Sequence, residues 1–377
     1  MSKKPTIVDL FSGCGGFGLG AELAGFHTVV AVDIDPTLQS AYKKNFPNTR
    51  TITQDVSLIR KDDWELALAN TEIDGVIGGP PCQGYSRMGL CNPKDPRRTL
   101  LKEFFRQVNM IDPKFFVMEN VEGLLDKKNR PQLEDAMSII DEKFEVLPPQ
   151  IVDASEWGAP TKRKRVIVVG FNPLKISPVD LIDFVPPKIT TSVRDAISDF
   201  KEPIPQSEDK VDLGWNGYRR LKNISEYAQK MRRLPAPDLG DAFAKKQLLL
   251  GKSSGHFDTV HHQAVIERFF NTPQGKTDVK SRAKKLHWEG LCPTLRAGTG
   301  SDKGSFSSVR PIHPSKGRVI SVREAARLQG FPDWFVFHPT KWHSFRMIGN
   351  SVSPIVSEGI LGVLYHATLA ARIKKSA

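Results

Sequence analysis

A cysteine that follows two consecutive prolines is the residue of this chain best placed to act as a nucleophile. The segment GGPPCQ, residues 78–83, comes directly after the short apolar run 73–77. Two prolines oppose both helix and regular ladder pairing, so the strand must stop and the chain must turn. The sulfur of Cys82 is then fixed at the carboxyl end of a strand, where open α/β sheets bind ligands. Such a position suits covalent catalysis, and a buried, inert cysteine is the alternative.

An acid and a basic pair are the next candidates. Glu119 ends the apolar run 115–119, the next strand end after Cys82, so its carboxylate is expected at the same sheet edge. There it could act as a general acid. The run TKRKR, residues 161–165, precedes another strand, and in an extended chain Arg163 and Arg165 share a face. Such a pair can hold a phosphate or an electron-rich carbonyl, although a solvated run of charges is equally consistent with the sequence.

A glycine-rich turn suggests a cofactor. The first strand, 6–11, runs into SGCGGFGLG, residues 12–20, which lets a ligand approach the backbone. The next strand ends in Asp33, about 20 residues after the glycines, where an acid can bind ribose hydroxyls. Together they indicate an adenosine-containing cofactor. The dinucleotide spacing GxGxxG is only approximated, and glycines used purely for tight helix–strand packing are the alternative.

Composition narrows the class of protein. The 377 residues suggest two domains, or one domain with a large insertion. Lys and Arg number 54 against 42 Asp and Glu, and this net charge of +12 favours a polyanion such as nucleic acid as partner. No CxxC pair or zinc-type spacing occurs, so we expect no metal site, no disulfide framework and a reducing compartment. The cysteines are Cys14, Cys82, Cys91 and Cys292.

No secretory or membrane segment is expected. The amino terminus lacks the apolar region of a signal peptide. The apolar stretch 354–371 contains Glu358 and His366, so we interpret it as too mixed to span a bilayer. These features predict a cytoplasmic protein.

Alternating strand and helix signals predict an α/β fold with a doubly wound, mostly parallel sheet. The expected strands are 6–11, 28–33, 49–53, 73–77, 115–119, 144–147 and 165–171. Helices are expected at 35–45, 99–111 and 132–141, among others. The last two strands have little between them, so they are expected to pair antiparallel at an edge.

Regular patterning stops after Asn172 and returns at Ser321. Residues 172–320 are rich in Pro, Lys, Ser and Gly without sustained periodicity. A helix is expected at 322–328, ended by Gly330, and a final one at about 356–371. We therefore predict a catalytic domain made of 1–173 plus 321–377, and a smaller irregular domain, 174–320.

The chain resembles the DNA (cytosine-5)-methyltransferases of the standalone prokaryotic and phage type, which serve restriction-modification systems. The segments that carry the resemblance occur in the family's order and span nearly the whole chain. They are 9–20, 78–86, 116–121, 160–170, 322–333 and 348–354. The resemblance implies a Rossmann-like fold that binds S-adenosyl-L-methionine, and a target-recognition domain at 174–320. Two positions depart from the family pattern, because Thr161 replaces a glutamine and Ser353 a proline.

The resemblance also implies roles for individual residues. Cys82 is the implied nucleophile, Glu119 the acid at cytosine N3, and Arg163 and Arg165 contact the target base and nearby backbone. Phe11 would stack on adenine, Asp33 would hold the ribose and Asp55 the adenine amino group. The implied cofactor-binding residues are Phe11, Gly13, Cys14, Gly16, Asp33, Asp55, Pro81 and Asn350.

The implied reaction methylates C5 of a flipped-out cytosine in a specific sequence of duplex DNA, through a covalent bond from Cys82 to C6. The implied partners are double-stranded DNA and a cognate restriction endonuclease, with a monomeric protein acting at the nucleoid. Three alternatives stay open: an RNA (tRNA) cytosine-5 methyltransferase on the same scaffold, a catalytically silent DNA-binding relative, and a nucleotide-dependent oxidoreductase. Candidate readers of the DNA site are Arg194, Arg219, Arg220, Arg282 and Arg296.

Overall fold

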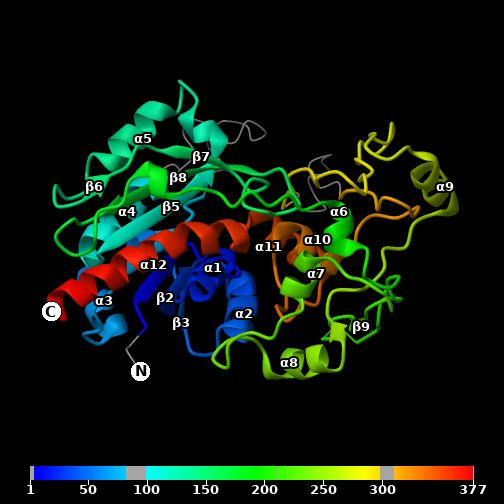
Figure 1. Cartoon of the computed structure of the whole chain (residues 1–377), viewed down its shortest axis with the longest axis horizontal. Helices are drawn as coiled ribbons and strands as arrows, with labels where there is room; N and C mark the ends of the chain where they lie inside the picture. Colours follow the sequence, from blue (N-terminus) through cyan, green and yellow to red (C-terminus); the bar gives the residue numbers. More distant parts are fainter. Residues whose placement is uncertain (1–3, 82–98, 210, 298–309, 377) are drawn as a thin grey trace.

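The computed structural model describes residues 4–81, 99–209, 211–297 and 310–376 (Figure 1). Its centre is an eight-stranded sheet of order β3-β2-β1-β4-β5-β8-β6, with β7 also paired to β8. Strands β1 to β5 are parallel, whereas β8 runs antiparallel to β5, β6 and β7. The bounds are β1 Thr6–Leu10, β2 His27–Asp33, β3 Arg50–Thr53, β4 Gly75–Gly78, β5 Phe115–Val121, β6 Glu145–Val146, β7 Gln150–Asp153 and β8 Lys164–Phe171.

Helices cover both faces of this sheet. The α-helices of the first half are α1 Gly16–Ala24, α2 Pro36–Asn45, α3 Lys61–Leu68, α4 Leu100–Ile111 and α5 Arg130–Met137. Those of the second half are α6 Val193–Ile197, α7 Glu226–Met231, α8 Ala242–Leu249, α9 Gln263–Asn271, α10 Val322–Gln329, α11 Lys341–Asn350 and α12 Pro354–Ser376. The short 3₁₀ turns are η1 Val56–Leu58, η3 Glu122–Leu125 and η4 Leu181–Asp183, and a two-stranded sheet pairs β9 Asn216–Gly217 with β10 Lys252–Ser253.

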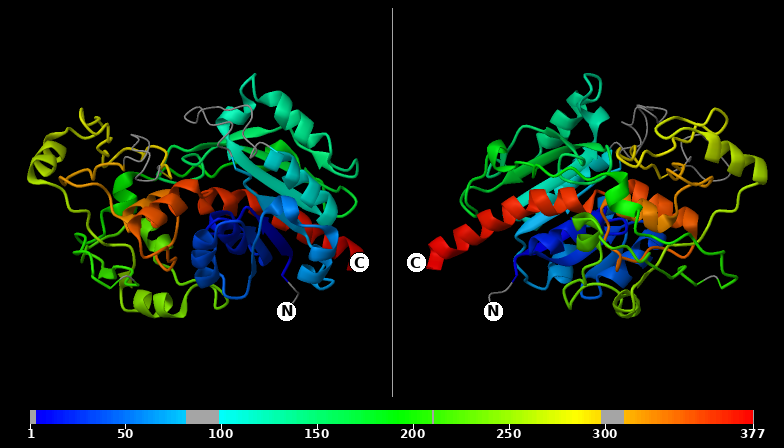
Figure 2. Two further views of the ribbon diagram at one scale, coloured as in Figure 1. Left: turned by 180° about the vertical axis from the view of Figure 1, so that it is seen from behind. Right: turned by 45° about the vertical axis from the view of Figure 1, so that its right-hand side comes forward.

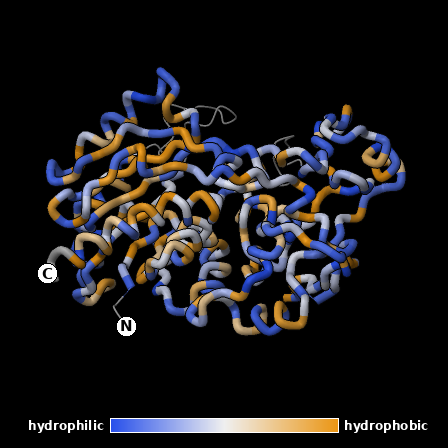
Figure 3. Tube along the Cα trace, in the orientation of Figure 1, coloured by the Kyte–Doolittle hydropathy of each residue, from blue (hydrophilic) through white to orange (hydrophobic). Residues whose placement is uncertain are grey.

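Alternation along the strands explains the layers. Successive side chains of a strand point to opposite faces. Ile7, Ile77 and Val117 therefore pack on one face, in a cluster with residues of α1 and α12. Val8 and Val76 pack on the other face, in a cluster with residues of α3, α4 and α5. The sheet is buried on both sides, which accounts for the mainly orange strands of the tube in Figure 3.

The long carboxyl-terminal helix α12 completes the first of these layers. It lies against α1 in the views of Figures 1 and 2. The Ser357 hydroxyl donates to the Phe17 carbonyl at 2.7 Å, and Arg372 forms an ion pair of 2.9 Å with Asp74. Helix α12 thus covers one face of the sheet to which β1, the first strand of the chain, belongs.

Most sequence predictions of elements are confirmed, and three details are wrong. Every expected strand is present, and the last two pair antiparallel as predicted. The sequence analysis missed the short strand β7 and expected a later start for α12. The helix expected at 132–141 is α5, which begins and ends earlier, at 130 and 137. Gly349 and Asn350 are the last two residues of α11.

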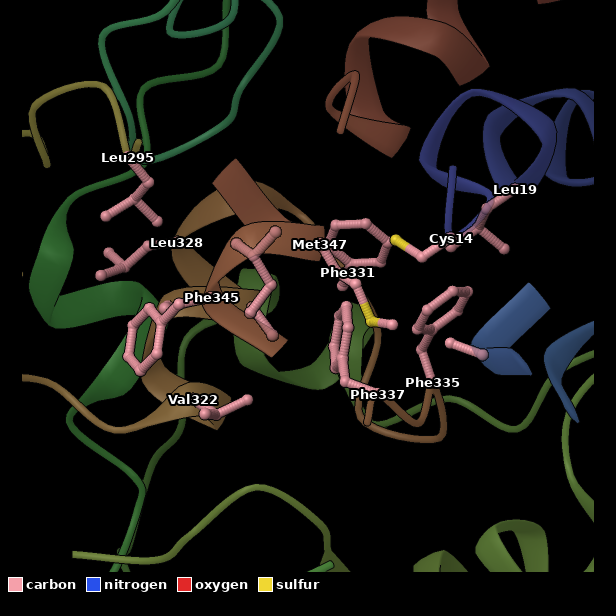
Figure 4. Packing of buried hydrophobic residues seen from close by; sticks show 14 of the residues in the cluster. Cys14, Leu19, Leu295, Val322, Leu328, Phe331, Phe335, Phe337, Phe345 and Met347 are labelled. Carbon is pink, nitrogen blue, oxygen red and sulfur yellow. The ribbon is translucent and has the colours of Figure 1, made fainter. Parts of the chain in front are cut away.

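Residues 190–320, called the second half from here on, lie to the right in Figure 1 and consist of short helices and long loops. This second half shares a core with the first half: Cys14 and Leu19 belong to the same buried cluster as Leu295, Phe331 and Met347 (Figure 4). Residues 174–189 do not yet leave the catalytic sheet. The Ser177 amide donates to the Ala367 carbonyl of α12 at 3.3 Å, and Phe184 packs against the α12 cluster.

A buried ionic cluster ties α10 to this second half. Arg327 is fully buried and pairs with Asp199 at 3.1 Å and with Asp333 at 2.6 Å. Tyr218 donates a 2.6 Å hydrogen bond to Asp333, and Arg232 pairs with Asp199 at 2.5 Å. Each buried charge therefore has an opposite charge and further hydrogen bonds, as such groups require.

The helical stretch Lys341–Ile373 is long and apolar enough to cross a membrane by length and composition. The expectation that Glu358 and His366 make it too polar is therefore wrong. Two-thirds of its most apolar window (67%) is buried inside the protein, so packing against the sheet accounts for its composition. Within the residues that the structure describes, no group of three or more His, Cys, Asp or Glu side chains could hold a metal ion.

Candidate active site

A cavity of about 420 Å³ opens at the carboxyl ends of β1, β2, β4 and β5. The order of the strands in the sheet reverses between β1 and β4. Such a switch point is where open α/β sheets bind ligands, and the volume suits a small organic molecule. Every predicted cofactor residue lines it, namely Phe11, Gly13, Cys14, Gly16, Asp33, Asp55, Pro81 and Asn350. Glu119, Arg163 and Arg165 line the same cavity. Cys82 follows Pro81 directly and lies outside the described residues.

The turn after β1 is built from left-handed backbone conformations. Phe11 leaves the strand with φ 54°, and Gly13 and Gly15 follow with φ 56° and 98°. A non-glycine residue rarely adopts such a φ, and strained backbone of this kind gathers at functional sites. The Ser12 amide donates to the Val32 carbonyl at 2.9 Å and so anchors the turn to β2. The turn therefore brings the Phe11 side chain and the glycine backbone to one cavity wall.

Asp33 holds that turn in place. One carboxylate oxygen accepts from the Gly13 amide and the other from the Asp35 amide, both at 2.8 Å. Burial raises the pKa of Asp33 above its usual value, although these backbone hydrogen bonds act in the opposite direction. Asp55 begins the turn η1, and its side chain accepts from the Ser57 amide at 2.9 Å. Carboxylate oxygens have lone pairs beyond these bonds, so both residues can still accept from a ligand.

Two cavity residues were missed by the sequence analysis. Ile34 is 65% exposed although it is apolar, and it lines the cavity beside Asp33. Its position directly after the predicted ribose acid was the available signal. Asp9 is fully buried, and among the residues that the structure describes its Oδ1 atom has no hydrogen-bond partner. Burial raises the pKa of Asp9 well above its usual value, even though Tyr42 donates to its other oxygen at 3.3 Å.

The predicted acid and one predicted arginine face each other. Arg165 lies two residues from Ile167, the cross-strand partner of Glu119, so both side chains point to one face of the sheet. The Arg165 Nε atom is 2.8 Å from Glu119 Oε1. A side chain at Gly79 would place its Cβ 3.3 Å from Glu119 Oε2. The glycine therefore leaves room above the carboxylate, on the turn that leads to Cys82.

Asn120 fixes that turn, a role that the sequence analysis did not assign. Its side-chain amide donates to the Pro80 carbonyl at 3.2 Å, and the residue is 1% exposed. The end of β5 therefore carries Glu119 and, through the next residue Asn120, also holds the turn after β4 that contains Pro81.

Arg163 is placed differently from Arg165. It is only 3% exposed, and its guanidinium donates to the backbone carbonyls of Leu295, Gly349 and Ser351. The resemblance implies that both arginines contact the target base or nearby backbone. The packing of Arg163 favours a role inside the protein, whereas Arg165 faces Glu119.

Two of the cysteines are unsuited to nucleophilic attack. Cys14 and Cys292 are buried, and burial raises the pKa of Cys14 to about 12 and that of Cys292 still further. Thiols with raised pKa values contain almost no thiolate near neutral pH. Of the four cysteines, only Cys82 and Cys91 are left as nucleophile candidates, and both lie outside the described residues.

The candidate DNA readers are all on the surface. Arg194, Arg219, Arg220, Arg282 and Arg296 are exposed. Arg194 forms an ion pair of 2.5 Å with Glu289 and lies over the Trp288 ring. Exposure is consistent with contact to a ligand, but it does not distinguish contacts with bases from contacts with phosphates.

The family model of the C-5 cytosine-specific DNA methylases matches residues 5–366. The chain belongs to this family. It is a DNA (cytosine-5)-methyltransferase with the Rossmann-like fold predicted for it. The catalytically silent relative and the oxidoreductase are thereby set aside, and the family description names DNA as the substrate.

The similarity to known proteins covers almost the whole length of this methyltransferase. It is 39% identical over 370 residues to the type II methyltransferase M.XorII of Xanthomonas oryzae, covering 97% of this chain and 85% of the relative. It is 31% identical to the type II methyltransferase M.DdeI of Desulfomicrobium norvegicum, covering 94% and 87%. A crystal structure described as a prophage-encoded DNA modification methyltransferase (E. coli) superimposes with a TM-score of 0.85 at 38% identity, covering 96% of this chain and 99% of that one.

Proposed function

We propose that this methyltransferase uses S-adenosyl-L-methionine to methylate C5 of a cytosine flipped out of duplex DNA, through a covalent bond between Cys82 and C6. One observation supports this most. The predicted cofactor residues come from segments as distant as Phe11 and Asn350, yet all line one cavity. The same cavity includes Glu119, Arg165 and the proline turn that precedes Cys82.

The cavity fits S-adenosyl-L-methionine by its donor set. Phe11 and Ile34 offer apolar surface to a flat base, and the Asp33 carboxylate can accept from ribose hydroxyls. The buried Asp9 Oδ1 has no partner within the described residues, so it is available to an ammonium group. When bound, S-adenosyl-L-methionine supplies an electrophilic methyl group.

The protein's own groups activate the cytosine. Cytosine C5 is a poor nucleophile, so addition of the Cys82 thiolate to C6 makes it electron-rich. Glu119 protonates or hydrogen-bonds N3 and so takes up the charge that develops on the ring. Arg165 orients Glu119 through their ion pair. After methylation, loss of the C5 proton expels the Cys82 thiolate and restores the aromatic ring. The base must leave the stack for this chemistry, which costs a few kcal/mol.

We further propose that residues 174–320 select the DNA sequence and that the enzyme is the modification half of a type II restriction-modification system. The relatives that it resembles are named type II methyltransferases. A cognate endonuclease would then cut the same site. Grafting this region from a relative with another target should move methylation to that relative's site, and an active chimera that keeps the original site would contradict the assignment.

Tritium transfer from labelled S-adenosyl-L-methionine, followed by bisulfite sequencing of DNA from expressing cells, tests the main proposal. We expect label in duplex DNA and protected cytosines at one short sequence. Label in tRNA alone would favour the RNA alternative. A duplex with 5-fluorocytosine at the target should trap a denaturation-resistant adduct, because fluorine prevents loss of the C5 proton, and its absence would contradict the covalent route.

A further inference from the structure

A short segment of the second half, residues 292–297, is built into the catalytic lobe. We call it the strap. The Cys292 amide donates to the Pro160 carbonyl, and the Lys162 amide donates back to the Cys292 carbonyl, both at 2.9 Å. The Thr294 hydroxyl donates to the Lys162 carbonyl at 2.6 Å. The strap therefore lies alongside the chain that leads into β8.

Arg163 joins the strap to the end of α11. Its Nη1 atom donates to the Leu295 carbonyl at 3.3 Å, and its Nη2 atom donates to Gly349 at 3.0 Å and to Ser351 at 2.9 Å. A buried guanidinium needs hydrogen-bond acceptors, and these three carbonyls supply them to Nη1 and Nη2. These three carbonyls come from segments more than 130 residues from Arg163 along the chain. Their positions relative to one another thus depend on one side chain.

The end of α11 is also a wall of the cofactor cavity. Gly349, Asn350, Ser351 and Val352 line it. The Ser351 hydroxyl is 3.2 Å from the Cys14 sulfur, and a Cβ at Gly16 would lie 2.6 Å from the Val352 carbonyl oxygen. A Cβ at Gly349 would clash with the backbone amide of Ala297. The strap, Arg163 and the glycine turn are therefore in one continuous chain of contacts.

We propose that Arg163 is a positioning residue that couples DNA binding in the target-recognition region to cofactor binding in the cavity. The proposal rests on the function proposed above. A shift of the strap when duplex binds moves Leu295, and the shared guanidinium transmits this to the carbonyls of Gly349 and Ser351 at the cavity wall. Coupling between two sites is reciprocal, so the cofactor must raise the affinity for duplex by the same factor.

Linkage measurements test this coupling. The affinity of the full-length enzyme for S-adenosylhomocysteine is measured by calorimetry with and without a duplex that carries the site found by bisulfite sequencing. We expect the wild type to bind S-adenosylhomocysteine about tenfold more tightly with duplex, within the usual range of coupling. Arg163→Lys keeps the charge but cannot span three carbonyls. It should reduce this factor to below about threefold. The factor is a ratio of affinities measured within one variant, so a change in the affinity for S-adenosylhomocysteine alone cancels from it.

Arg323 provides the matched control. It is fully buried and also donates to three carbonyls, those of Ser254, Pro332 and Phe335, but it does not line the cavity. Arg323→Lys should lower the melting temperature as Arg163→Lys does and leave the coupling factor intact. Equal loss of coupling in both variants would show a general effect of stability and overturn the proposal.

A second variant keeps the test decisive if Arg163→Lys fails to fold. Thr294→Val removes the 2.6 Å hydrogen bond from the strap to Lys162, keeps the shape of the side chain and leaves Arg163 intact, and it should also weaken the coupling. A wild type that binds both ligands without mutual effect refutes the coupling alone. A wild type that does not bind S-adenosylhomocysteine refutes the proposed function itself.

Discussion

The sheet of the first half and the loops of residues 190–320 stabilise themselves by different means. In the first half, strands of up to eight residues bury both faces beneath helices. In the second half the strands β9 and β10 have two residues each, and the helices are capped by side chains such as Ser192, Ser225 and Asp241. The sheet fixes the residues at its strand ends by backbone pairing, whereas the helices of residues 190–320 depend on individual polar side chains at their ends.

The shifted pKa values follow the same division. In the first half, burial raises the pKa values of Asp9 and Asp33, which line the cavity. In the second half, burial lowers the pKa of His256 to about 3 and that of His313 to about 4. Burial thus disfavours the charged form in both halves, at cavity-lining carboxyl groups in one and at histidines packed inside the protein in the other.

The largest effect is expected at the strand end itself. Cys82→Ser should lower methyl transfer by on the order of 10⁴-fold or more, because it removes the nucleophile on which the covalent route depends. DNA binding should persist, as a gel-shift assay will show. Methylation near the wild-type rate in this variant would exclude Cys82 as the nucleophile.

A large loss of stability is expected in the second half. Arg327→Met leaves Asp333 buried without its ion-pair partner and leaves Asp199 with Arg232 alone, so it should lower the free energy of unfolding by about 3–5 kcal/mol. Urea denaturation measures this. Lys230→Met removes a 2.7 Å ion pair with Glu358 that is partly exposed, and it should cost less than about 1 kcal/mol. Similar losses of unfolding free energy in the two variants would contradict the conclusion that the second half depends on its buried polar side chains.

Acid should destabilise the second half before it affects the sheet. The unfolded chain binds protons at His256 and His313 below about pH 6.5, whereas the folded chain does not until about pH 3 to 4. Stability therefore falls as pH decreases below 6.5, by about 1.4 kcal/mol per pH unit for each histidine. Urea unfolding at pH 7.5 and 5.5 should differ by about 2–3 kcal/mol. His256→Gln should roughly halve this difference, and an unchanged slope would show that His256 does not contribute.

The smallest of these effects concerns the cofactor. Asp33→Ala should weaken binding of S-adenosyl-L-methionine by about 1–3 kcal/mol, the usual loss when charge-assisted hydrogen bonds are removed. Calorimetry measures it. Asp238→Ala, which loses a 3.0 Å ion pair with Lys4 and does not line the cavity, is the matched control and should bind nearly as wild type. Unchanged affinity in Asp33→Ala would contradict the assignment of the ribose acid.

The sequence predicted the catalytic half well because its signals are local. The glycine turn, the proline turn and Glu119 each mark the end of a strand, and strand ends of a parallel sheet meet at one edge. The fixation of the proline turn by Asn120 could not be predicted, because its partner Pro80 lies in the turn after a different strand, β4. The same holds for Arg163, whose three carbonyls lie at 295, 349 and 351. The resemblance placed the residues at the site, but only the fold shows which of them contact one another.

The position of α12 has a consequence for how the enzyme is made. A ribosome delivers the glycine turn and the proline turn first, and domains fold as units as they emerge. The face of the sheet against which Ser357 and Arg372 pack stays uncovered until the last residues have been synthesised. Residues 190–320 are by then synthesised, because they precede α12 in the chain. A nascent or prematurely terminated chain therefore lacks a helix that covers the sheet, so the cavity at the strand ends is completed only after residues 190–320 are present.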